Sequence, residues 1–407
     1  MRTRVLGGQN GVKRSALWNT VREGVRRRVS SGDVGVWPVV VGLVLIGILF
    51  QSQNSNYLTA RNLSNLTLQI GVLGTLAIAV VMVLLLGEID LSIAAVSGVC
   101  AGVLGVLVAN HGWNGWVAIA AALAVGAAIG LIQGSWVVFV GVPSFIVTLA
   151  GLLVWQGVLF NLLGVEGELI VSDSSVRAIA SSYLTPLEGW GLAIIGLTAY
   201  AAYLWFGYRG RQRVGLEGPS LPTLLVRFAL AAALTVAVVA LLNSYFGVPY
   251  VVVILLALTV VFTIVTTRTA FGRHIYAIGG NAEAARRAGI HVGAVRIAVF
   301  AIASTLGALG GVLEASREFA VSTGTGGGTL LLNAIAAAVI GGTSLFGGRG
   351  QIYNALLGAL VIGGVQNGLD LLGQTASTED IATGVILALA VSIDAFSRRR
   401  ARASGLR

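Results

Sequence analysis

Long apolar stretches, separated by short polar links, run through almost the whole of this sequence. The 407-residue chain is 56% hydrophobic and only 10% charged, whereas a soluble domain carries roughly 25% charged residues. So few charges cannot cover the surface of a water-soluble protein of this length. Because about 20 apolar residues suffice for one helical crossing of a bilayer, the sequence predicts an all-α, polytopic membrane protein.

About twelve apolar segments have the length and hydropathy of spanning helices. They begin near Trp37, Leu66, Leu91, Trp116, Pro143, Trp190, Leu224, Pro249, Val295, Thr329, Ile352 and Ile381. The link at 87–91 is very short and the block at 329–348 is rich in small residues, so either could be a broken or re-entrant helix. We therefore expect about 10–12 transmembrane helices. The 56 glycines, many of them inside these segments, predict closely packed helices.

The basic excess of the chain, a net charge of +10, is concentrated in short polar stretches between apolar blocks. This is the positive-inside pattern rather than a nucleic-acid-binding surface. Arginine-rich stretches lie at 1–36, 208–223, 266–295 and after 396, and they alternate with an acidic stretch at 165–189. We therefore expect cytoplasmic N- and C-termini, with Arg61 and Arg317 as two exceptions on outer-side loops.

The basic tail at 1–36 allows two interpretations. Apolar residues recur at every fourth position between Arg14 and Ser30, which could form an amphipathic helix on the anionic cytoplasmic leaflet. A solvated, disordered tail is the alternative. A transmembrane domain at 37–397 and a second basic tail at 398–407 follow. No small-residue cleavage site follows the first apolar block, so we expect that block to be an uncleaved first span rather than a signal peptide.

Several kinds of chemistry are excluded by the residues present. The only lysine, Lys13, is followed by arginine, so the chain has no phosphate-binding Gly-Lys-Ser/Thr motif and no standard nucleotide site of its own. His111, His274 and His291 are scattered, which argues against a metal site. Cys100 is the only cysteine and reads as a small core residue. We expect no catalytic residues, no cofactor and no enzymatic activity.

A short polar segment within the 266–295 stretch has the features of a capped helix. Asn281 can cap it, Glu283 favours its first turn, and Gly289 would end it. Ala284, Ala285 and Ala288, with Arg286 between them, would leave a nearly smooth face. Such a helix could be a rigid plug for a groove on a partner protein, or simply an ordinary loop helix.

This loop resembles the coupling loop of bacterial ABC-transporter permeases, and most closely that of the ribose/galactose/xylose permease family. Three further blocks carry the resemblance in the family's order: GEIDLS at 87–92, PSFIVTL at 143–149 and the block at 333–348 that ends in a Gly-Gly-Thr-Ser turn. Glu88, and an additional pair of apolar segments at about 190–266, resemble the xylose-type branch. The sequence LLLN at 330–333 departs from the acidic Glu-Leu-Asp often found there.

The resemblance implies the membrane-spanning permease subunit of a monosaccharide importer, with xylose as the expected sugar, in the bacterial inner membrane. It implies a separate cytoplasmic ATPase that binds the ATP and contacts Glu283, Ala284, Ala285, Arg286 and Gly289. An extracytoplasmic sugar-binding protein and a second permease copy, forming a homodimer, are the other implied partners. The alternatives are a branched-chain amino-acid ABC permease and an ion-coupled secondary sugar transporter. Proton coupling, which the second alternative would use, needs acids in the middle of a span, and the candidate acids of this chain lie at span ends.

Two acids at the end of a span, Glu88 and Asp90, are candidate functional groups. A charge at the bilayer centre costs about 3 kcal/mol on insertion scales, so it persists only when paired, hydrated or near an interface. One interpretation is a polar joint at which helices tilt during gating. The other is that Asp90 is the N-cap of the span starting at Leu91, and the two are compatible. Ser92, Gly341 and Gly342 are further gating or packing candidates.

Uncharged polar residues inside apolar blocks are candidates for the sugar path. Gln133, Asn333 and Asn367 lie in or beside predicted spans. A neutral sugar needs a few such groups, but interhelical hydrogen bonds worth about 0.6 kcal/mol each are the more frequent use of buried amides in membranes.

Overall fold

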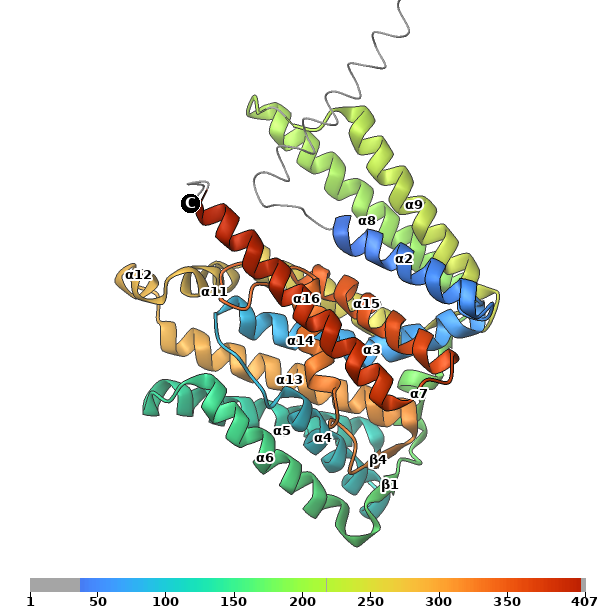
Figure 1. Cartoon of the computed structure of the whole chain (residues 1–407), viewed down its shortest axis with the longest axis vertical. Coiled ribbons are helices and arrows are strands. Elements are labelled where there is room, and N and C mark those ends of the chain that lie inside the picture. The colour runs from blue at the N-terminus through green and yellow to red at the C-terminus, as the bar shows by residue number, and fades with distance from the viewer. Residues whose placement is uncertain (1–36, 217, 404–407) are drawn as a thin grey trace, which may run out of the picture.

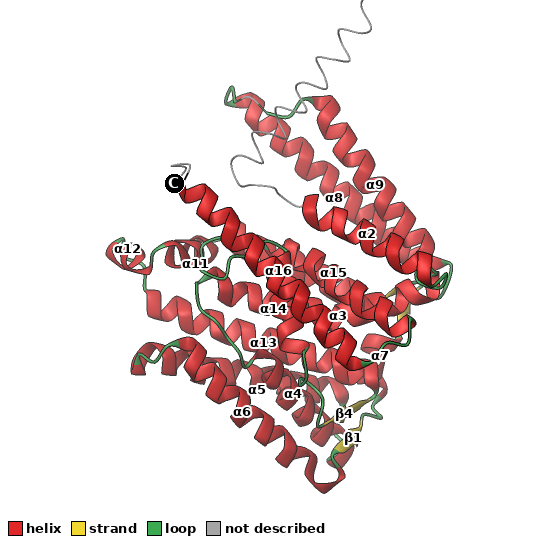
Figure 2. Cartoon of the chain, in the orientation of Figure 1, coloured by secondary structure: helices red, strands yellow, loops and turns green. Residues whose placement is uncertain are grey.

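The computed structural model describes residues 37–216 and 218–403, and most of them are helical (Figures 1 and 2). The tail at 1–36, with the helix considered at Arg14–Ser30, lies outside the described residues, as do residues 404–407. The longer helices are α2 (Trp37–Gln53), α3 (Ala60–Leu85), α4 (Ile93–Gly105), α5 (Gly115–Ser135), α6 (Ser144–Leu163), α8 (Pro186–Arg213), α9 (Leu221–Asn243), α10 (Tyr250–Arg268), α13 (Val292–Glu318), α15 (Ile352–Leu371) and α16 (Ala376–Ala403). The shorter elements are η1 (Val106–Asn110), η2 (Trp136–Val140), η3 (Gly164–Glu166), β1 (Glu168–Ile170), α7 (Ser174–Ser181), β2 (Tyr183–Leu184), β3 (Val248–Pro249), α11 (Ala270–Gly280), α12 (Ala282–Arg287), β4 (Ala320–Ser322) and α14 (Leu330–Ile340).

Each predicted apolar segment forms a helix, which confirms the all-α polytopic fold class. In the described part of the chain, nine helices are long and apolar enough to cross a membrane. α2, with 17 residues, is near the lower limit for a crossing. α14 has only 11 residues, or about 16 Å at 1.5 Å per residue, roughly half of the hydrocarbon thickness. The block predicted to be irregular is therefore a half-length helix followed by the non-helical segment 341–351.

The bundle has two ends that differ in structure. One carries α11 and α12, and we call it the α12 end. The other, the β1 end, carries α7 and the antiparallel pair β1–β4, in which Leu169 is opposite Val321. α13 connects the two, because it begins directly after α12 and its 27 residues end just before β4. The acidic stretch at 165–189 and the basic stretch at 266–295 therefore lie at opposite ends.

The core is built around α3, which packs against α10, α13, α14 and α15, while α13 also packs against α4 and α5. Glycines allow the closest approaches. A Cβ atom on Gly311 of α13 would collide with the Ser97 carbonyl oxygen of α4, and one on Gly130 of α5 would collide with the Phe300 carbonyl oxygen of α13. Cys100 is fully buried between these helices. The predicted close packing is therefore present.

The pair α8–α9 lies at the periphery of the bundle, packed mainly on itself (Figure 1). It begins with a capping box in which Thr185 and Glu188 exchange hydrogen bonds. Large apolar side chains along both helices face outward, for example Ile195, Leu230 and Leu234, each 66–68% exposed. This is the additional apolar pair seen in the sequence, and its outer face is suited to lipid.

Candidate functional site

The predicted capped helix is present as α12. The Asn281 side chain accepts a hydrogen bond of 2.9 Å from the Ala284 amide. Gly289 ends the helix with φ +87, a conformation that side chains other than glycine rarely adopt. Both the start and the end of this helix thus follow from the residue types read in the sequence.

The surface of α12 differs from the predicted smooth alanine face. Ala285 is only 4% exposed and packs into the core, so it cannot belong to an exposed surface. An isolated two-turn helix is marginal, and it needs one apolar face against the protein body. The outer face instead carries charge: Glu283 forms ion pairs of 3.1 Å with both Arg286 and Arg287.

The α11–α12 unit sits directly on the irregular parts of the bundle. A Cβ atom on Gly279 would collide with the Leu85 carbonyl oxygen at the end of α3. The same oxygen accepts a hydrogen bond of 3.0 Å from the Gly348 amide. The Tyr276 hydroxyl donates to the Gly350 carbonyl over 2.7 Å, and burial raises the pKa of this phenol. α11 therefore joins α12 to α3 and to the 341–351 segment.

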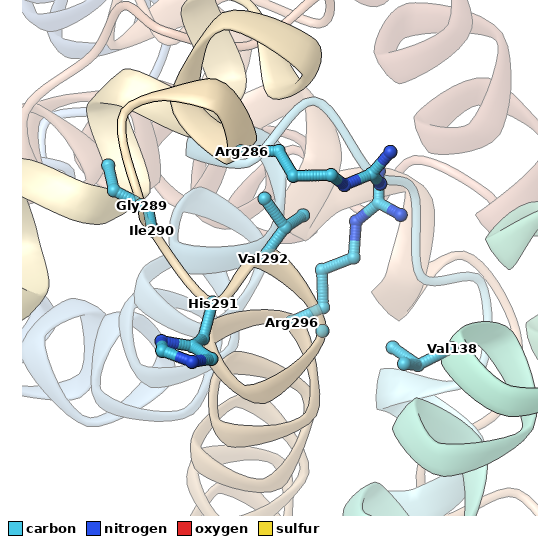
Figure 3. A pocket seen from close by; sticks show the side chains of 8 residues that line it. Val138, Arg286, Gly289, Ile290, His291, Val292 and Arg296 are labelled. Atoms are coloured by element: carbon cyan, nitrogen blue, oxygen red, sulfur yellow. The ribbon is translucent and has the colours of Figure 1, made fainter.

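A cleft of about 410 Å³ opens beside α12, between η2 and the first turns of α13 (Figure 3). Its walls include Val138 on η2, Arg286 on α12 and Arg296 on α13. The guanidinium of Arg296 pairs with the Glu88 carboxylate at 2.9 Å. The side chains are 28% and 13% exposed respectively, so this ion pair is largely desolvated.

Arg296 is the partner that the sequence interpretation missed. The sequence marks Glu88 as an acid that must be paired, hydrated or interfacial, and the pair explains how it is accommodated. The sequence signal for this partner was Glu88 itself, because an acid near an apolar segment needs a nearby cation. Few arginines lie inside the apolar segments, and Arg296 is one of them, in the first turns of α13.

The segment from Glu88 to Ser92 is non-helical and is held by side chains of α6. The Ile89 amide donates to the Ser144 hydroxyl at 3.3 Å, and the Leu91 amide donates to the Thr148 hydroxyl at 3.0 Å. Irregular backbone in a membrane protein needs such partners, because an unpaired amide is costly there. Two sequence blocks that carried the family resemblance thus meet in space.

Asp90 does not have the predicted N-cap position. The helix begins at Ile93, with Ser92 at the N-cap and without a side-chain cap. The Asp90 carboxylate accepts hydrogen bonds from the Ser92 amide at 2.8 Å and the Ser92 hydroxyl at 2.6 Å. It therefore closes a local turn before the helix. The Ser92 hydroxyl also lies 3.0 Å from the Gln133 amide oxygen on α5. The segment 88–92 is therefore connected to both α5 and α6.

The remaining candidates fall in separate places. Asn333 on α14 donates to the Thr329 hydroxyl at the start of its own helix, at 3.4 Å. Gly341 follows α14 where a Cβ atom would collide with the Asn354 carbonyl, and Gly342 adopts φ +87. Asn367 forms a reciprocal pair with Asn62, at 2.7 and 3.1 Å, near the β1 end. Gln133, Asn333 and Asn367 make hydrogen bonds in three separate places, and their role in the sugar path stays a prediction.

The described residues contain no cluster of three or more potential metal ligands. The arrangement offers hydrogen bonds, one desolvated ion pair and close backbone contacts rather than reactive groups. It is suited to holding helices at a joint and moving them.

Comparisons with known proteins identify the family. Residues 62–391 match the family model described as branched-chain amino acid transport system / permease component. The xylose transport system permease protein XylH of Escherichia coli (strain K12) is 38% identical over 375 residues, covering 91% of this chain and 94% of the relative. The corresponding protein of Haemophilus influenzae is 36% identical over 381 residues, covering 92% and 99%. The ribose import permease protein RbsC of E. coli (strain K12) is 33% identical over 356 residues, covering 86% and 91%. No solved structure matches.

Proposed function

This chain belongs to the branched-chain amino acid transport system / permease component family, and we propose that within it the protein is the membrane-spanning subunit of an ATP-driven xylose importer. Permease components are transport subunits rather than enzymes. The protein would form the path for the sugar in the bacterial inner membrane. ATP would be bound by a separate ATPase, which accords with the absence of a nucleotide-binding motif from the sequence.

The observation that carries the proposal is the position of α12. This short helix projects from the bundle, with Glu283 and Arg286 more than half exposed. Its base is packed, through α11, on the end of α3 and on the segment 341–351. A partner that moves α12 would therefore also act on two irregular segments inside the bundle. Coupling between an ATPase and the sugar path requires such an element, which contacts the partner on one side and the bundle on the other. The partner can shift the bundle between two conformations only if its contacts differ between them.

The choice of sugar rests on the relatives. Two xylose permeases match at 36–38% identity over nearly their whole length, and ribose and L-arabinose permeases follow at 33% and 29%. The family description names branched-chain amino acids, so an amino-acid permease is the second candidate. Glu88 and the α8–α9 pair resemble the xylose-type branch, and this resemblance favours the sugar.

The orientation and the partners follow from the same interpretation. The α12 end would face the cytoplasm, where the positive-inside rule places the basic stretch at 266–295. The β1 end would face the extracytoplasmic binding protein. Two copies of the chain would form a homodimer around the path, since ABC ATPases work in pairs.

The test is uptake into vesicles that contain the chain, its ATPase and its binding protein. Xylose, ribose, galactose and leucine are supplied in labelled form, with and without ATP. We expect ATP-dependent xylose uptake that is lost when Glu283→Ala is combined with Gly289→Pro, and when Ala284→Trp blocks the exposed face of α12. The control is Val214→Trp, at a 68% exposed position in the link between α8 and α9. Leucine uptake would establish the amino-acid alternative, and ATP-independent uptake driven by an ion gradient would refute the proposal.

A further inference from the structure

A second pocket, of about 400 Å³, lies at the β1 end, on the side of the bundle opposite α12. It is an open pocket lined by the first turns of α3, the last turns of α15 and the end of α13. Six of the eight residues that line it are polar: Asn62, Asn65, Gln69, Arg317, Asn367 and Asp370. Such a concentration of polar groups stands out in a chain that is only 10% charged.

The floor of the pocket is fixed. Asn62 and Asn367 hold each other through two amide hydrogen bonds, and they are only 7% and 4% exposed. Asn62 also donates to the Tyr57 carbonyl at 2.8 Å. These bonds lock α3 to α15, so the pocket keeps its shape without a ligand.

The wall of the pocket, in contrast, offers free amides. Asn65 and Gln69 lie four residues apart on α3 and therefore share one face of the helix. Neither side chain makes a hydrogen bond to another described residue, although both line the cavity. Each amide can both donate and accept, which matches the dual character of a hydroxyl group.

The charge of the pocket is balanced. Among the lining residues, Arg317 and Asp370 contribute one charge of each sign and the other polar groups are neutral; Arg317 also pairs with Glu318, outside the lining, at 3.8 Å. Leu68 and Leu371 supply apolar surface. A balanced pocket with several amides and a small apolar wall suits a neutral polyhydroxylated ligand better than an anion or a cation. Its volume falls within the usual range for small-molecule sites.

We infer that this pocket, defined by Asn65, Gln69, Arg317, Asn367 and Asp370, binds a single neutral sugar of the pentose class at the β1 end. The inference rests on the proposed function, which supplies the sugar, and adds the place where the permease itself first contacts it. The pocket receives the sugar before the helices open. Asn65 and Gln69 contact its hydroxyl groups, and Asn367 acts as a positioning residue through Asn62.

Binding can be measured separately from transport by cysteine protection. Cys100 is fully buried, so the wild-type chain is the unlabelled blank for a membrane-impermeant maleimide. Asn65→Cys is prepared in the permease–ATPase complex in lipid nanodiscs, without binding protein. We expect millimolar xylose to slow labelling of the introduced thiol at least threefold, and leucine to have no effect. Asn56→Cys, exposed at the same end but outside the pocket, should label equally with or without xylose.

The transport arm uses Asn65→Ala with Gln69→Ala. Because these amides have no partner in the described structure, the double variant should fold normally. Loss of two neutral hydrogen bonds should raise the half-saturating sugar concentration about tenfold, with the maximal ATP-driven rate nearly unchanged. Asn56→Ala is the matched control.

Three results would overturn the inference. One is an Asn65→Cys thiol that xylose does not protect while the wild type still transports xylose with ATP, a result that would leave the proposed function intact. Another is equal protection by leucine. The third is that the Asn65→Ala/Gln69→Ala variant no longer binds the binding protein while xylose fails to protect the Asn65→Cys thiol. This result would make the surface a protein-docking site. Absence of ATP-driven uptake by the wild type refutes only the proposed function, because protection measures the pocket alone.

Discussion

α3 and α9 are equally hydrophobic, yet they occupy opposite environments. In the most apolar 18 residues of each, 89% of α3 is buried in protein but only 11% of α9. α3 contains Ser64, Gly71, Gly74 and Thr75, all buried, whereas α9 contains no glycine and exposes four leucines: Leu221, Leu225, Leu230 and Leu234. Hydrophobicity therefore indicates that a helix enters the membrane but not whether it packs on protein or faces lipid. The two helices differ instead in glycine, which lets α3 approach its neighbours closely.

The largest effect that follows from this contrast concerns glycines. Gly311→Val should prevent assembly, because the new side chain would strike the Ser97 carbonyl of α4. Overpacking typically costs about 1–3 kcal/mol, and a rigid backbone obstacle places this variant at about 3 kcal/mol or more. Gly196→Val in α8 is the control, since no atom lies within 4 Å of where its Cβ atom would be. Size-exclusion profiles and melting temperatures in detergent measure both. Equal losses would show that α8 is packed against protein after all.

The ion pair between Glu88 and Arg296 provides the next test. Glu88→Gln and Arg296→Gln should each destabilise the protein by about 1–3 kcal/mol, because each leaves a largely desolvated charge without its partner. The double variant Glu88→Gln/Arg296→Gln should recover part of that loss. The cycle is followed by thermal unfolding, with ATP-driven uptake as the second measurement. Strictly additive losses would mean that the two charges do not interact.

A smaller effect should separate two threonines. Thr148→Val removes the acceptor of the Leu91 amide and should cost about 1–2 kcal/mol. Thr305→Val, which loses only a hydrogen bond to its own helix at Ala301, should cost much less. Thermal unfolding of both variants decides the matter. If Thr305→Val proved as damaging, the irregular joint would have no special dependence on α6.

The smallest effect belongs to the outer face of α9. Leu230→Ala combined with Leu234→Ala should change the free energy of unfolding by no more than about 0.5 kcal/mol, because both side chains face outward. The variant is compared with the wild type in the same lipid. A loss of several kcal/mol would indicate that another protein surface covers α9 in the membrane.

Much of the architecture was predictable from sequence. All twelve apolar segments became helices, because apolar length is a local property that the chain carries in each segment. The cap at Asn281 and the stop at Gly289 were predictable for the same reason. The half-length of α14 was indicated only by its small residues.

The contacts between segments were not predictable. The partner of Glu88 and the side of α12 that Ala285 faces depend on how helices pack, and no local pattern specifies that. The N-cap prediction for Asp90 is wrong because Ser144 and Thr148, more than 50 residues away, hold the backbone before Ile93 in a non-helical conformation. The β1-end pocket likewise joins residues from three distant helices.

The junction of Gly87, Gly279 and Gly347 is a place where main chains touch without intervening side chains. A Cβ atom on Gly347 would lie 2.7 Å from the Gly279 carbonyl oxygen and 2.8 Å from the Gly87 Cα atom. Side chains can change rotamer and absorb a small displacement, but bare backbones in contact have no such freedom. A displacement of α11 at this junction would therefore act directly on the backbone after α3 and on the 341–351 segment, and side-chain rotamer changes could not absorb it.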